Sequence, residues 1–295
     1  MVKQKVALVL SSGGARGLAQ IGVIEELEKR GYQISSISGT SIGSVVGGAY
    51  AAGGLASYKD WMLSLTKKEV FNLMDFTIRN LGFMKGKKVF DEMQKRIPNI
   101  NIEDLPIPFV ALSTNLETNK EVVFDRGNLY EALRASISIP TLFVPYLHNS
   151  HHLVDGGLLN PIPVNHVKRN EDDILVAVNL NAHESNFQLK KIENKMLEDI
   201  SDWNYFNIYK KFARGFPKSQ GENLSYINIL NRSLGIMLNR ICELELKLNQ
   251  PDILIDISRN TSSTFEFYRA KEIINAGTKA AIFALDNYEN KIAKK

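Results

Sequence analysis

Gly39-Thr40-Ser41-Ile42-Gly43 lies between a strand-like segment, Gln33–Ser38, and a run of small residues, Ile42–Ala52. A serine on a sharp turn from strand to helix projects from the fold, where its hydroxyl can attack a carbonyl carbon. Glycine tolerates the crowding on either side of such a turn. A serine between glycines also occurs in ordinary turns, but the strand before it and the helix after it favour a nucleophile at Ser41.

A second glycine-rich segment stands upstream of this turn. Val6–Leu10 is a continuous apolar run, which is typical of a central parallel strand buried on both faces. Ser12–Gly17 follows, and a predicted helix then extends to Arg30, where Gly31 is the kind of residue that commonly ends a helix. The order strand, glycine loop, helix, strand, serine turn and helix predicts an α/β fold around a mostly parallel sheet.

The loop Ser12-Gly13-Gly14-Ala15-Arg16-Gly17 leaves the first predicted strand and opens a helix. We expect its backbone N–H groups to point outward with the positive end of the helix behind them, which suits the negative oxygen of a tetrahedral intermediate. Glycine-rich turns of this kind also bind nucleotide phosphates. The loop lacks the Gly-Lys-Ser/Thr ending of a P-loop and the glycine spacing of a dinucleotide site, which favours an oxyanion hole.

The composition is that of an ordinary globular protein, with 44% hydrophobic and 23% charged residues. The net charge of +4, from 36 basic and 32 acidic residues, is too small and too dispersed to indicate nucleic-acid binding. The single cysteine, Cys242, cannot form an internal disulfide, so a reducing cytoplasm is the expected setting. We identify neither a secretory leader nor an apolar run of the roughly 18 residues that a spanning helix needs, and expect at most peripheral membrane contact.

The rest of the chain continues the α/β pattern without a repeat or a linker. Strands are predicted at 107–112, 121–124, 142–147, 152–154, 173–179 and 253–257, and helices over much of 57–105 and at 129–136, 185–250 and 265–292. We therefore predict one domain, 1–295, with a catalytic core at 1–183, a helical insertion or cap at 184–250 and a closing strand and helix at 251–295.

A serine nucleophile needs a base, and the chain offers two kinds of candidate. The histidines stand in no motif that marks one of them out: His148, His151, His152, His166 and His183. Asp155-Gly156-Gly157 is better marked, because an aspartate at the end of a predicted strand exposes its carboxylate and glycines let another loop approach closely. A plain turn also explains Asp-Gly-Gly, so the residues alone leave the base open.

Four blocks, taken in order, resemble the patatin-like phospholipases, specifically the compact bacterial members. They are the glycine loop at 11–17, the serine turn at 39–43, Arg134-Ala135-Ser136-Ile137-Ser138-Ile139-Pro140, and Asp155-Gly156-Gly157. The resemblance spans most of residues 5–180 and is reduced to short patches beyond 184. Ser12 stands where the loop of that family usually has its first glycine.

The resemblance implies a three-layer α/β/α fold that carries a lipolytic serine acyl hydrolase, with an acyl ester of a phospholipid or related lipid as substrate. Ser41 would be the nucleophile and Asp155 its proton acceptor, in a dyad that uses no catalytic histidine, no metal and no cofactor. The residues implied for the oxyanion hole are Gly13, Gly14, Ala15 and Arg16. The glycines implied to support the motifs are Gly39, Gly43, Gly156 and Gly157.

Several alternatives stay open at the level of the sequence. The motifs define the reaction but not the leaving group, so a thioester could replace the ester, and a non-enzymatic binding or regulatory protein could retain the same fold. Trp203–Phe212 combines aromatic residues with Lys210 and Lys211. This segment fits a lipid interface or burial against the core or a second subunit, which also leaves a homo-oligomer open.

Overall fold

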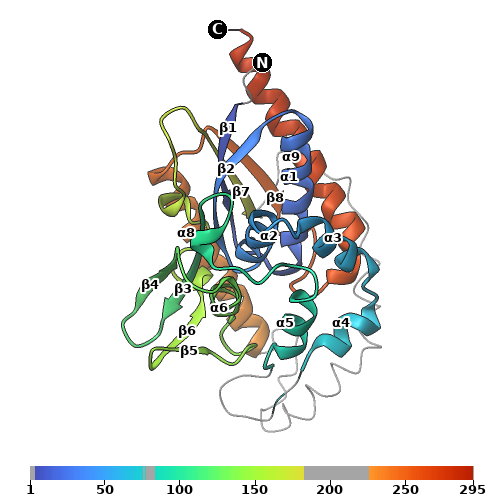
Figure 1. The fold of residues 1–295 in the computed structure, drawn as a ribbon, viewed down its shortest axis with the longest axis vertical. Coiled ribbons are helices and arrows are strands. Elements are labelled where there is room, and N and C mark those ends of the chain that lie inside the picture. The colour runs from blue at the N-terminus through green and yellow to red at the C-terminus, as the bar shows by residue number, and fades with distance from the viewer. Residues whose placement is uncertain (1–3, 76, 78–83, 183–225, 295) are drawn as a thin grey trace. The chain divides into compact units, whose positions relative to one another are not determined.

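The structure, a computed structural model, describes residues 4–75, 77, 84–182 and 226–294 (Figure 1). The chain divides into two compact units. The first comprises Met1–Asn186 and Leu238–Lys295, and the second is Phe187–Met237, of which only 226–237 are described. The sheet and the candidate active site both belong to the first unit.

Among the described residues, eight strands form one sheet in the order β5-β6-β3-β2-β1-β7-β8, with β4 also paired to β3. The run β3-β2-β1-β7-β8 is parallel, whereas β4, β5 and β6 pair antiparallel. The strands are β1 (Lys5–Leu10), β2 (Gln33–Thr40), β3 (Phe109–Asn115), β4 (Lys120–Phe124), β5 (Tyr146–His148), β6 (His151–Asp155), β7 (Ile174–Ala182) and β8 (Ile253–Ser258).

The described helices connect these strands and close the first unit. They are α1 (Ala19–Lys29), α2 (Ile42–Ala51), α3 (Leu55–Ser64), α4 (Lys67–Leu73), α5 (Lys87–Met93), α6 (Leu129–Ser136), α8 (Tyr226–Leu248) and α9 (Ala270–Ile292). Short 3₁₀ turns include η1 (Gly14–Leu18), η3 (Gly156–Leu158), η4 (Val164–His166) and η7 (Phe267–Arg269).

Helices cover both faces of the sheet. On one face, α1, α2 and α9 contribute to a large apolar core that includes Val6 and Leu8 of β1 (Figure 1). On the other face, Ala7 and Val9 of the same strand belong to a smaller core that includes Cys242 of α8. Adjacent residues of β1 are buried in different cores, which explains why the strand is a continuous apolar run. This arrangement confirms the predicted three-layer α/β/α fold with a mostly parallel sheet.

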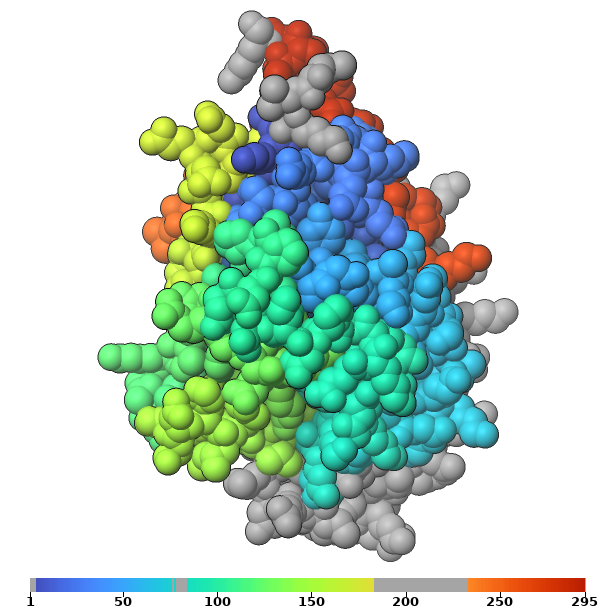
Figure 2. All heavy atoms as spheres, viewed as in Figure 1, coloured from blue at the N-terminus to red at the C-terminus, as the bar shows by residue number. Residues whose placement is uncertain are grey.

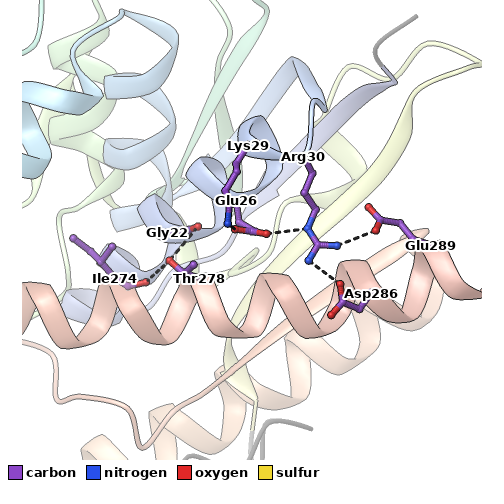
Figure 3. A network of polar contacts seen from close by, with 8 residues as sticks. All are labelled: Gly22, Glu26, Lys29, Arg30, Ile274, Thr278, Asp286 and Glu289. Carbon is purple, nitrogen blue, oxygen red and sulfur yellow. Dashed lines mark hydrogen bonds and ion pairs between the residues drawn. The ribbon is translucent and has the colours of Figure 1, made fainter. Parts of the chain in front are cut away.

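The closing helix α9 packs along α1, and Figure 3 shows the polar contacts between them. The two backbones approach closely at Gly277, where an added Cβ would lie 1.8 Å from the carbonyl oxygen of Ala19. Nearer the end of α1, Arg30 forms ion pairs with Asp286 at 2.7 Å and Glu289 at 2.9 Å. Both carboxylates are largely exposed, so these pairs contribute little and the close packing at Gly277 decides the contact.

We expect Gly277→Ala to destabilise the first unit by about 2 kcal/mol, because the added methyl group overlaps Ala19 and forces α1 and α9 apart. Chemical denaturation followed by circular dichroism measures this change. The matched control is Asn275→Ala, since Asn275 lies on the same helix with its side chain exposed. A Gly277→Ala variant as stable as the control would contradict the close contact.

Most predicted elements are confirmed, with their ends shifted by a few residues. The strand predicted at 142–147 is wrong in its first part, because β5 begins only at Tyr146, directly after Pro145, which has no N–H to donate to a sheet. The division into a core, a 184–250 insertion and a closing segment stays a prediction, because residues 183–225 lie outside the described part. Across the described ranges, no helix combines the length and apolar character of a membrane span.

Candidate active site

The serine turn connects β2 to α2. Ser41 has φ 57° and ψ −126°, a left-handed φ that is uncommon for a residue with a side chain. The turn is so tight that a Cβ added at Gly39 would lie 2.6 Å from backbone atoms of Gly43. Backbone segments approach too closely at Gly39 and at Gly43 for a larger residue at either position, which is why the Gly-x-Ser-x-Gly spacing predicts the turn.

The pairing of β2, β3 and β6 places Asp155 at the same edge of the sheet as Ser41. Thr40 at the end of β2 pairs with Leu112 of β3, and the next residue of β3, Ser113, pairs with Asp155 of β6. The Ser41 hydroxyl donates a hydrogen bond to Oδ2 of Asp155 at 2.5 Å, and both residues are buried. Two side chains 114 positions apart in the sequence are therefore in direct contact.

The environment of Asp155 disfavours its charged form. Burial raises the pKa of this carboxyl to about 6, against hydrogen bonds from the Ser41 hydroxyl and the Gly157 amide that act to lower it. The Gly157 N–H donates to Oδ1 at 2.8 Å and so fixes the orientation of the carboxylate. A carboxylate with this pKa is still mostly ionised at pH 7 and is a stronger base than an exposed aspartate.

The glycine loop lies beside this pair. An added Cβ on Gly157 would be 3.2 Å from the Ser12 hydroxyl and 3.0 Å from the Asp155 carboxylate, so Ser12 lies close to the carboxylate. The N–H groups of Gly13 and Gly14 donate to no described residue, whereas the Ala15 N–H donates to the Thr264 carbonyl at 3.0 Å. Two main-chain donors of the loop are therefore available to a ligand.

The Arg16 side chain contacts main-chain carbonyls of two other segments. Its guanidinium donates to the carbonyl oxygens of Leu180 at 3.2 Å and Ser262 at 3.0 Å. Burial, followed by the charge of Arg259, lowers the pKa of Arg16 to about 10. These bonds attach the glycine loop to the end of β7 and to the segment after β8, so the guanidinium positions the loop.

Two serines of the block at 134–140 form hydrogen bonds with the backbones of Ser41 and Asp155, and sequence analysis assigned them no role. The Ser136 hydroxyl accepts the Ser41 N–H at 2.9 Å, and the Ser138 carbonyl accepts the Asp155 N–H, also at 2.9 Å. Gly156 also needs to be small, because an added Cβ would lie 2.4 Å from the Leu112 carbonyl. In the sequence, this block could be recognised only by its resemblance to a known family, and that resemblance did not indicate these hydrogen bonds.

The described histidines lie elsewhere. His166 contacts Glu121 at 2.5 Å, and His152 contacts Glu117 at 2.7 Å, each through a ring nitrogen. His148 packs its ring against those of Phe124 and Tyr146. In the part of the chain that the structure describes, no histidine forms a hydrogen bond with Ser41 or Asp155; His183 falls outside that part. Nor do the described residues include three His, Cys, Asp or Glu side chains grouped to hold a metal.

Ser41 and Gly14 also line an apolar pocket. The pocket has a cavity volume of about 120 Å³ and opens to solvent, and its walls are mostly aliphatic and aromatic side chains of α2, α3, α4 and α5. On the face drawn in Figure 2, α5 in teal and the β5–β6 region in yellow-green lie next to each other. Phe143, before β5, forms an isolated parallel bridge with Met84, before α5, and both residues line the pocket. The segment Trp203–Phe212, for which a lipid interface and burial against the core or a second subunit were both left open, lies outside the described residues.

Comparisons with known proteins give consistent matches. The family model of patatin-like phospholipase matches residues 8–168. An uncharacterized NTE family protein of Mycobacterium tuberculosis is 32% identical over 97% of this chain and 92% of its own length. Lysophospholipase NTE1 of Cryptococcus neoformans is 28% identical over 94% of this chain, which spans 17% of that longer protein. The crystal structure of VipD from Legionella pneumophila is similar with a TM-score of 0.49 and 15% identity, over 97% of this chain and 67% of that one.

The family model and the relatives identify the class of protein as a hydrolase that acts on ester bonds of lipids. The chain belongs to the patatin-like phospholipase family, because the family model covers more than half of it and the mycobacterial relative matches almost all of it. The resemblance found in the sequence is confirmed.

Proposed function

We propose that this chain hydrolyses acyl esters of lipids with a Ser41–Asp155 dyad, through an acyl-enzyme intermediate. The observation that carries the proposal is the 2.5 Å hydrogen bond from the Ser41 hydroxyl to a buried carboxylate whose other oxygen is fixed by the Gly157 amide. A nucleophile and a base within hydrogen-bond distance, with the base oriented by a third group, is the arrangement that nucleophilic catalysis needs.

In the first half of the reaction, the Ser41 Oγ forms a bond to the ester carbonyl carbon while Asp155 accepts its proton. The carbonyl oxygen becomes an oxyanion, and the free N–H groups of Gly13 and Gly14 stabilise it. We therefore propose these two amides as the oxyanion hole. Arg16, whose guanidinium is held by two carbonyls, keeps the loop in place. The C–O bond then breaks, and the leaving alcohol takes the proton from Asp155.

In the second half, water attacks the acyl-enzyme. Asp155 accepts a proton from the water, the same amides hold the second oxyanion, and the Ser41–acyl bond breaks as Ser41 recovers its proton from Asp155. The products are the free fatty acid and the regenerated enzyme. The apolar pocket that contains Ser41 is suited to the acyl chain, because burying each CH₂ of the chain gains about 0.8 kcal/mol.

We propose a lysophospholipid as the substrate, because the fungal relative is a lysophospholipase and aligns with 94% of this chain. The chain spans only 17% of that protein, so the similarity concerns one part of it.

Labelling with a fluorophosphonate probe tests the reaction class, because such probes react with activated serines. We expect mass spectrometry to locate the label on Ser41, and we expect release of fatty acid from lysophosphatidylcholine. A matched pair of oxygen ester and thioester substrates then identifies the leaving group. Absence of both labelling and turnover in folded protein would favour the non-enzymatic binding role.

A further inference from the structure

Two buried side chains that line the pocket beside Ser41, Tyr58 and Trp61, carry polar groups that form no hydrogen bond with a described residue. Tyr58 of α3 lines the pocket and is only 3% exposed, yet its hydroxyl forms no hydrogen bond with any described residue. Asp75, a charged residue of the same lining, is satisfied by the backbone N–H groups of Gly86 at 2.6 Å and Lys87 at 2.7 Å. Tyrosine hydroxyls in largely buried positions normally have a hydrogen-bond partner, and because the Tyr58 hydroxyl is not sealed from solvent, a bound molecule can supply one.

Three other half-buried or buried tyrosines follow the usual rule. The hydroxyls of Tyr32, Tyr50 and Tyr130 donate to Glu289, Glu28 and the Ile97 carbonyl at 3.1, 2.8 and 2.8 Å. Burial is the only cause that raises the pKa of both Tyr58 and Tyr130, so the two tyrosines differ in the hydrogen bond that Tyr130 forms and that Tyr58 forms with no described residue.

The Tyr58 hydroxyl has access to open space. Some buried polar side-chain atoms of the described residues are sealed from solvent and have no hydrogen-bond partner. They belong to Gln20, Thr114, Asn160 and Ser262. The Tyr58 hydroxyl is not one of them, and the space that Tyr58 lines is the pocket. The ring is held by Trp61, which packs edge-on against it at 5.9 Å between centroids and lines the same pocket.

We propose that the Tyr58 hydroxyl binds an oxygen atom carried by the acyl chain, so that the pocket selects long-chain acyl groups with a hydroxyl or oxo group over plain hydrocarbon chains. This inference rests on the proposed function, since it takes the occupant of the pocket to be the acyl group of the ester that Ser41 attacks. A plain chain leaves the hydroxyl buried and unpaired, whereas an oxygen-bearing chain satisfies it. Sites with a buried hydrogen-bonding group discriminate strongly against analogues that lack the matching atom.

The test uses long-chain p-nitrophenyl esters that carry one hydroxyl at successive positions along the chain, with the unsubstituted ester of equal length as reference. We expect kcat/KM of the wild-type protein to be about tenfold higher for the ester whose hydroxyl reaches Tyr58 than for the reference. In Tyr58→Phe, which removes only the hydroxyl, this ratio falls to about one. Equal kcat/KM values across the series in the wild-type protein, as expected if water occupies the site, would overturn the proposal.

The matched control is Tyr130→Phe. Tyr130 is also buried, but it does not line the pocket and its hydroxyl donates to the Ile97 carbonyl. We expect this variant to lose stability and to keep the wild-type preference, whereas Tyr58→Phe loses the preference without that loss of stability. A preference that persists in Tyr58→Phe would exclude Tyr58 as its origin. Failure of the wild-type protein to hydrolyse any ester of the series would instead count against the proposed function.

Discussion

Replacing Ser41 by alanine lowers ester hydrolysis by at least about 10³-fold while the fold is retained. Removal of the nucleophile from a serine hydrolase leaves only the contribution of the oxyanion hole and of substrate binding. Among the described residues, the Ser41 side chain forms a hydrogen bond only with Asp155, so its removal is expected to leave α2 and β2 in place. Steady-state hydrolysis of a p-nitrophenyl ester, with circular dichroism as the check on folding, measures both parts of this expectation.

Ser38→Ala is the matched control for Ser41→Ala. Ser38 lies on β2, shortly before the turn that contains Ser41, is fully buried, and donates its hydroxyl to the Pro163 carbonyl at 2.8 Å. Its removal leaves that bond unmade and costs about 1 kcal/mol of stability, but the residue has no part in the reaction. We expect the control to be less stable and still active. A Ser41→Ala protein with wild-type turnover would show that another nucleophile acts.

The positions of the reacting groups could be predicted from local sequence, because local geometry creates the signals. The close approach of backbone segments around Ser41 requires glycine at positions 39 and 43, so the turn can be recognised from this fixed glycine spacing. The continuous apolar run of β1 follows in the same way from burial on both faces. The contact of Ser41 with Asp155 could only be inferred from family resemblance, because it depends on the register of β2, β3 and β6.

The roles of Arg16 and Tyr58 could not be predicted, for two physical reasons. The carbonyls that accept hydrogen bonds from the Arg16 guanidinium belong to Leu180 and Ser262, which are distant in the sequence. Every residue has a main-chain carbonyl, so the type of residue does not indicate which carbonyls act as acceptors. The Tyr58 hydroxyl is informative because it lacks a partner, which only the packed structure reveals. In both cases tertiary contacts, rather than residue type, determine what the side chain does.

Asp155→Asn removes activity and increases stability at alkaline pH. The amide has nearly the shape of the carboxylate and can still accept the Gly157 N–H and donate to Ser41, but it cannot take up a proton. We expect hydrolysis to fall by at least about 10³-fold. In the wild-type protein, activity decreases as the pH falls through about 6, because protonation of Asp155 removes the base. This pH dependence is absent from the residual activity of the variant.

The stability change follows from the direction of the pKa shift. The pKa of Asp155 is raised to about 6 in the folded protein, above the value of about 3.9 in an unfolded chain. The carboxyl is protonated in both states below about pH 4; as the pH rises to about 6, ionisation favours the unfolded chain, and stability is lost by roughly 3 kcal/mol. Asparagine does not ionise, so Asp155→Asn is more stable than the wild-type protein at pH 8, and the difference shrinks toward pH 4.

Asp173→Asn provides a control of opposite sign. Burial acts to raise the pKa of Asp173, but hydrogen bonds from Ser35 and Asn170 outweigh it and lower that pKa below its ordinary value. The ionised carboxylate of Asp173 therefore stabilises the fold above about pH 4, and this contribution is lost as the pH falls below that value. Denaturant unfolding at pH 8 and pH 4 should show Asp173→Asn destabilised mainly at pH 8, where Asp155→Asn is stabilised. If both variants are destabilised at pH 8, Asp155 does not have the desolvated carboxylate on which the proposed catalysis depends.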